Sequence, residues 1–168
     1  AILISMMLAT EDIFTEDYND GSLEQTIIQE SSFQVGIGLK VFVYWFLIGI
    51  PVSLLSFIFS FGTTQNFELS LPIFPLSLIS SYIFLNIFVL GNSLSLNKGS
   101  VLGALITMPI ALPVLIVLGK SMTALQFDIN FESFILLLLG SLSIIIVLIP
   151  IVVSLSLIHI SEPTRRRG

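Results

Sequence analysis

The side chains that most often perform chemistry are scarce in this chain of 168 residues. It has no cysteine, which excludes disulfides, thiolate metal sites and cysteine nucleophiles. The single histidine, His159, cannot build a histidine cage, and no G-x-x-x-x-G-K-[ST] phosphate loop is present. We therefore expect no catalytic residue, no metal site and no ATP-hydrolysing site in the chain, which is then not an enzyme.

The polar side chains that remain are concentrated in one acidic stretch, residues 11–30, EDIFTEDYNDGSLEQTIIQE. It holds seven of the eleven acidic residues and no lysine or arginine. Asp20 and Gly21 form a turn dipeptide, because glycine adopts a positive φ without strain. Ser22 and Gln25 have the spacing of a capping box, in which two side chains satisfy backbone amides reciprocally. A short helix is therefore predicted after the turn.

This short predicted helix has an apolar ridge. Leu23 and Ile27 are four residues apart and so share one face, while Glu24 falls in the first turn, where the helix dipole favours a carboxylate. Such a helix is suited to docking on a partner; the alternative is a solvated loop with a chance capping box. Lys40 follows at the start of the next apolar stretch, where its long stem can reach the membrane surface.

The elements that position this stretch are membrane spans. The chain is 55% hydrophobic and only 10% charged, whereas a soluble domain is about a quarter charged. Apolar windows of about 20 residues are long enough to cross a bilayer. They lie near 38–60, 71–92, 100–119 and 134–157. The apolar residues 1–10 are too short to span, so we interpret them as the truncated end of an earlier span.

The predicted fold is therefore all-α, a polytopic transmembrane helical bundle with four full spans and one truncated span. Residues 61–70 and 120–133 would lie on one side of the membrane, and residues 10–37 and 92–100 on the other. No ionisable residue falls in the middle of a predicted span, which disfavours an ion-coupled carrier. The acidic balance gives no reason to expect nucleic acid, which needs clustered Lys or Arg.

Two prolines four residues apart, Pro109 and Pro113, fall inside the predicted third full span. Each removes a backbone donor and crowds the preceding turn, so each is expected to bend its helix. One interpretation is a hinge or a polar notch along a substrate path. The other is that membrane helices tolerate proline because their neighbours re-satisfy the backbone.

Residues 16–40 resemble the cytochrome c maturation protein B family, also called the haem exporter protein B family. EDYNDGSLEQ, followed by Lys40 at the start of a span, matches the (E/D)D-(F/Y)-x-DGSLEQL-like motif after that family's second membrane helix. Residues 97–121 and 134–157 resemble its proline-containing fifth helix and its last helix. The resemblance implies an ABC-2-type permease-like bundle with six helices at full length. Residues 1–157 would then be a single transmembrane permease domain with a coupling loop at 11–37.

The resemblance also implies partners. A separate ABC ATPase subunit would hydrolyse ATP, and haem-handling membrane partners and a haem chaperone would complete the delivery of haem to c-type cytochromes. In ABC permeases the helix of this loop docks on the ATPase. The coupling role is thereby assigned to Asp20, Gly21, Ser22, Leu23, Glu24, Gln25 and Ile27.

The expected function is a permease subunit acting in haem delivery or haem-chaperone release for cytochrome c maturation. A generic ABC-2-type exporter permease for another substrate, or a membrane scaffold that transports nothing, are the alternatives. Haem would be handled by the complex, without a cofactor bound to this chain, because methionine in an apolar span is typical of packing. The methionines in question are Met6, Met7, Met108 and Met122. A bacterial inner membrane is expected, with a mitochondrial inner membrane as the alternative.

The composition changes abruptly after Leu157, to IHISEPTRRRG. The string ISEPTRR resembles translated sequencing adapter, so residues 158–168 are expected to be a foreign or disordered tail, a sequencing artefact. The alternative is an authentic basic tail on the cytoplasmic side, in agreement with the positive-inside rule.

Overall fold

The computed structural model describes residues 2–11, 13–22, 25, 33–96, 100–127 and 130–165, and every regular element within them is helical. The elements are α1 (Ile2–Thr10), α2 (Thr15–Asn19), α4 (Phe33–Tyr44), the π-helix η1 (Trp45–Gly49), α5 (Ile50–Thr64), α6 (Phe67–Ser70), α7 (Ile73–Ser95), α8 (Ser100–Gln126) and α9 (Glu132–Arg165). Leu23, Glu24, Ile27 and Lys98 lie outside the described residues.

Four helical stretches are long and apolar enough to cross a membrane. They are Phe33–Thr64, Phe67–Ser95, Val101–Gln126 and Glu132–Ile160. Each covers one of the four predicted spans, so the predicted all-α, polytopic fold is confirmed. The apolar residues at the start of the chain form α1, a helix of nine residues.

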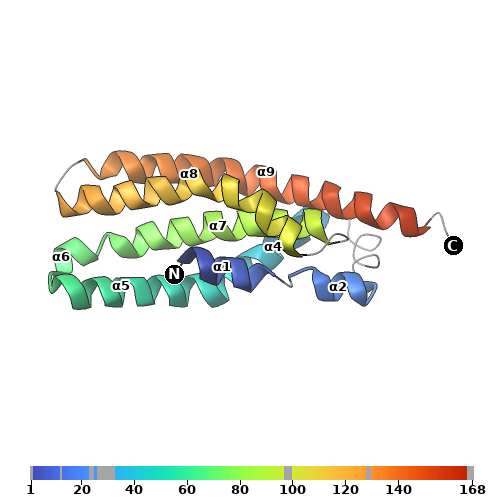
Figure 1. Ribbon diagram of the computed structural model, residues 1–168, viewed down its shortest axis with the longest axis horizontal. Coiled ribbons are helices and arrows are strands. Elements are labelled where there is room, and N and C mark those ends of the chain that lie inside the picture. Colours follow the sequence, from blue (N-terminus) through green and yellow to red (C-terminus); the bar gives the residue numbers. More distant parts are fainter. Residues whose placement is uncertain are drawn as a thin grey trace.

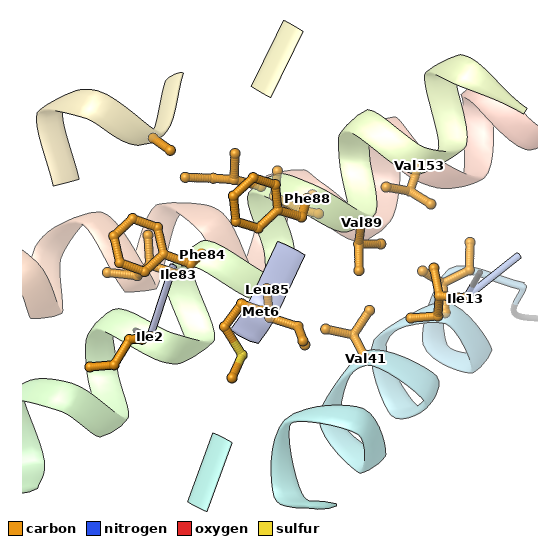
Figure 2. Close-up of a cluster of buried hydrophobic side chains, with 14 of the residues drawn as sticks. Ile2, Met6, Ile13, Val41, Ile83, Phe84, Leu85, Phe88, Val89 and Val153 are labelled. Atoms are coloured by element: carbon orange, nitrogen blue, oxygen red, sulfur yellow. The ribbon is translucent and has the colours of Figure 1, made fainter. Parts of the chain in front are cut away.

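Helix α7 is the centre of the bundle (Figure 1). It lies between the pair α8 and α9 and the helices α1 and α5, whereas α4 packs mainly against α9, and α7 has the largest buried part of any helix described. Phe84, Leu85 and Val89 of α7 are fully buried, and Figure 2 shows Leu85 beside Met6 of α1 and Val89 toward Val41 of α4. Asn86, a polar residue deep in this span, is 2% exposed, and its Nδ2 donates to the Tyr82 carbonyl oxygen at 2.8 Å.

Glycines allow α7 and α8 to touch through their backbones. A Cβ built on Gly103 would lie 2.8 Å from the Gly91 carbonyl oxygen, and one built on Gly91 would lie 2.9 Å from the Gly103 carbonyl oxygen. Small residues at a helix crossing permit such an approach, which supplies packing energy inside a membrane, where water does not drive helices together.

The first full span changes its winding where a proline follows. Pro51 stands at the start of α5, directly after the π-helix η1. A proline inside a helix clashes with the carbonyl four residues earlier, here that of Leu47. The wider π winding at 45–49 gives that carbonyl room, and it lets the chain continue as one helical span from Phe33 to Thr64. The span thus accommodates Pro51 through a π turn.

The two ends of the bundle carry different connections (Figure 1). The end of α5, α6, the end of α8 and the start of α9 lie at one end, while α2, the end of α7 and the start of α8 lie at the other. This agrees with the predicted sidedness of the connectors. Helix α9 extends beyond the predicted boundary at Leu157, because the backbone is helical as far as Arg165.

Candidate functional site

The acidic segment begins with a helix that sequence patterns do not predict. Helix α2 covers Thr15–Asn19 and therefore precedes the Asp20-Gly21 turn, whereas the only helix predicted in this loop follows it. Glu16 and Asp17 occupy its first turn, where carboxylates are favoured by the helix dipole. The predicted coupling loop 11–37 thus contains a helix at its start, and its end overlaps α4, which begins at Phe33.

The turn itself has the predicted backbone. Gly21 has φ +72°, a left-handed conformation that glycine adopts without strain. The Asp20 amide donates to the Glu16 carbonyl oxygen at 2.9 Å, and Ser22 Oγ donates to the Asp17 carbonyl oxygen at 3.3 Å. These two bonds tie the turn back onto α2.

The structure describes four of the seven predicted coupling residues. Asp20, Gly21, Ser22 and Gln25 are exposed, and the backbone is helical at Ser22 and at Gln25. Leu23, Glu24 and Ile27 lie outside the described residues, so the predicted helix with its apolar ridge and its capping box stays a prediction.

An apolar plug holds the beginning of the segment in the bundle. Ile13 and Phe14, just before α2, are each only 2% exposed. Figure 2 shows Ile13 beside Val41 of α4, with Val89 of α7 nearby. Burying two large apolar side chains fixes the position at which α2 starts, because moving α2 would expose them.

An ion pair joins α2 to the first full membrane span. The Lys40 ammonium of α4 donates to the Asp17 carboxylate, and it also lies 5.2 Å from the centre of the Phe14 ring, within cation–π distance. The side chains of Lys40 and Asp17 are 30% and 41% exposed, respectively. Sequence reasoning missed this pair, although Lys40 is the first basic residue after a stretch of carboxylates that contains none.

A second tie connects the segment to α7. Asn92 Nδ2 donates to the Glu11 carbonyl oxygen at 2.6 Å. The acidic segment is therefore held on both sides, by α7 at Glu11 and by α4 at Asp17. The exposed turn at residues 20–22 therefore extends from a part of the chain whose position these two contacts fix.

The two predicted hinge prolines lie elsewhere. Pro109 and Pro113 are inside α8, nine and thirteen residues after its start at Ser100, and both are exposed. The structure does not bring them together with the coupling residues. Whether α8 hinges at these positions stays a prediction.

A cavity of about 230 Å³ opens between α1, α7 and α8. It is smaller than the roughly 300–1,000 Å³ typical of pockets that enclose drug-sized molecules. Three hydroxyl residues on its wall, Thr10, Ser95 and Thr107, donate to carbonyl oxygens of their own helices. Within the described residues, no group of three or more His, Cys, Asp or Glu side chains could hold a metal ion.

The methionines considered as haem ligands occupy different environments. Met6 is fully buried in the core, Met7 lines the cavity, and Met108 is 39% exposed on α8. These positions are not gathered around one space, and His159 is exposed near the end of α9.

Comparisons with known proteins give a consistent result. A family model described as CcmB protein matches residues 1–160. "Heme exporter protein B" of Haemophilus influenzae is 29% identical over 133 residues, which are 78% of this chain and 60% of that protein. Its namesake in Pseudomonas aeruginosa is 29% identical over 119 residues (69% and 53%), and that of Escherichia coli K12 is 26% identical over 144 residues (84% and 65%). The chain spans between about half and two thirds of the length of these relatives.

Proposed function

The chain belongs to the CcmB protein family, and from this premise we propose that it is the membrane permease subunit of an ABC-type complex that handles haem for cytochrome c maturation. The observation that carries the proposal is the family match over residues 1–160, together with relatives named Heme exporter protein B. The four membrane-length helices agree with a multi-pass membrane subunit. We place it in the bacterial inner membrane, where its activity is haem delivery or release of a haem-loaded chaperone.

Energy for this activity would come from a partner. An ABC ATPase subunit hydrolyses ATP, and it docks on the turn and short helix at residues 20–27. Support for this docking site comes from the exposure of its described residues, 20–22 and 25, and from the DGSLEQ motif that it contains. The ties at Glu11 and Asp17 also support it, since a docking element transmits displacement only if its base is fixed.

Cross-linking tests the docking site directly, because this chain contains no cysteine. In the full-length protein, Gln25→Cys should capture the ATPase subunit in intact membranes. Thr64→Cys, exposed at the opposite end of the bundle, is the matched control and should not. Capture from residue 64 but not from residue 25 would place the ATPase at the wrong end and refute the proposal.

The backbone of the turn provides a second test. Gly21→Pro forces φ to about −65° in place of +72°, so the turn cannot form. We expect the variant to insert in the membrane and to lose c-type cytochrome production. Gly21→Asn is the matched control, because asparagine tolerates the left-handed region. Equal cytochrome yields from the proline variant and the wild type would contradict the role of this turn.

A further inference from the structure

Asp17 is the residue at which the turn and the membrane span meet. Its backbone carbonyl oxygen accepts from Ser22 Oγ at 3.3 Å, and its carboxylate accepts from the Lys40 ammonium of α4. One residue of α2 therefore touches the start of the predicted docking segment on one side and a membrane helix on the other. From these contacts we propose that the Asp17–Lys40 ion pair is the joint through which the docking segment moves α4. This inference rests on the proposed function.

Lys40 has several carboxylates near it in the sequence as possible partners. Within residues 2–96, as far as the structure describes them, Lys40 is the only basic side chain. Glu11, Glu16 and Asp20 belong to the same acidic segment, yet Asp17 is the carboxylate that Lys40 contacts. Helix α2 sets this choice, because the buried Phe14 before it and the Lys40 ammonium above the Phe14 ring fix the first turn of α2 against α4.

The helix that carries Lys40 ends at an irregular turn, where a movement of α4 can be taken up. Trp45 begins the π turn η1 about 7 Å further along the helix, at 1.5 Å per residue. Its Nε1 donates to Ser81 Oγ of the central helix α7 at 3.0 Å. Its ring packs edge-on against the Tyr82 ring, with the two ring centres 5.3 Å apart. The part of α4 between Lys40 and Trp45 thus acts as a short lever. One end is held by the ion pair with Asp17 and the other by the contact of Trp45 with α7. The π winding at that point is the irregular turn at which the lever rotates.

A pair this exposed contributes little to folding, because water screens the attraction and the ordering of two flexible side chains offsets part of it. Neutral variants should therefore insert and fold. Their defect should be in the transfer of movement, which a purely stabilising contact would not produce. Spatial connection alone does not establish coupling, so a double-mutant comparison is required.

The test uses the full-length protein in the assembled complex with Asp17→Asn, Lys40→Gln and the exchange D17K/K40D. The exchange keeps the total charge of the chain. We expect both single variants to keep the Gln25→Cys cross-link and ATP hydrolysis while c-type cytochrome yield falls about fivefold or more, the lower limit usual for coupling between sites. The exchange should restore most of the yield. Glu16→Gln, a neighbouring carboxylate without this contact, and Lys40→Arg should resemble the wild type.

The two levels of interpretation fail in different ways. If the Gln25→Cys cross-link is absent even with wild-type Asp17 and Lys40, the proposed function itself is wrong. If the cross-link persists and the neutral variants keep full cytochrome yield, the ion pair transmits nothing and this inference is overturned. The inference is also overturned if D17K/K40D gives no higher cytochrome yield than the single variants. Only a direct ion pair recovers its function when the two charges are reversed.

Discussion

Replacing one glycine on the first full span tests how the π turn is held. Gly49 is the last residue of η1, and a Cβ at this position would lie 2.5 Å from Trp45 Cδ1, 2.8 Å from Trp45 Nε1 and 3.2 Å from Ser81 Oγ. Gly49→Ala must therefore push the indole away from α7. The indole would lose its hydrogen bond to Ser81 and its edge-on contact with Tyr82.

Three contributions determine the size of the effect. Alanine in place of glycine favours a helix by about 1 kcal/mol. Overpacking a filled site costs about 1–3 kcal/mol, and an interhelical hydrogen bond in a membrane contributes about 0.6–2 kcal/mol. The unfavourable contributions exceed the favourable one, so we expect Gly49→Ala to lower the free energy of unfolding by about 0.6–4 kcal/mol. Ser81→Ala removes the hydrogen bond without the clash and should cost about 0.6–2 kcal/mol.

Gly38→Ala is the matched control, because Gly38 lies on α4 and a Cβ there meets nothing within 4 Å. It should leave stability unchanged or raise it by up to about 1 kcal/mol. Unfolding in detergent is measured by circular dichroism, and the emission of Trp45, the only tryptophan of this chain, reports the displacement of the indole. Equal midpoints for the alanine variants at 38 and 49, with unchanged Trp45 emission, would refute the reasoning.

Two further substitutions test the rest of the bundle. Gly103→Ala should destabilise the protein more than Gly49→Ala, because its Cβ would meet the Gly91 carbonyl oxygen at 2.8 Å and backbone cannot rotate aside as a side chain can; detergent unfolding with Gly119→Ala as the unhindered control measures this, and similar losses at both sites would contradict the close crossing. The double variant P109A/P113A should stabilise α8, since each proline disfavours a helix interior by about 3 kcal/mol relative to alanine. If α8 is a hinge, c-type cytochrome yield should fall despite this gain in stability. An unchanged yield would mean that the helix only tolerates its prolines.

Hydropathy predicted the membrane spans well because a bilayer imposes one simple requirement. A segment without charges for about 20 residues has its backbone satisfied internally only as a helix. The four spans therefore followed from the sequence, as did the left-handed turn at Gly21, where residue type restricts φ. In each case the deciding interaction is local or comes from the solvent, so a single sequence contains it.

The features that sequence reasoning missed depend on pairs of distant residues. The π turn at 45–49 is indicated locally only by Pro51, and its position also reflects Trp45, which reaches Ser81, 36 residues further on. Gly49 then has to be small because Trp45 and Ser81 already fill the space. A helical pattern in the sequence does not reveal which of its glycines face another helix, and Gly38 and Gly49 look equivalent until α7 is in place.

The Asp17–Lys40 pair shows the same limit for the candidate site. Seven chemically similar carboxylates precede Lys40, and the structure describes four of them, Glu11, Glu16, Asp17 and Asp20. The selection of Asp17 follows from burial rather than charge, since Ile13 and Phe14 enter the core first and α2 then begins in a fixed direction. Apolar packing thus decides which ion pair forms, whereas charge variants of Asp17 and Lys40 test only the ion pair itself. A variant that loosens the plug, such as Phe14→Ala, should therefore impair the coupling even though Asp17 and Lys40 are both intact.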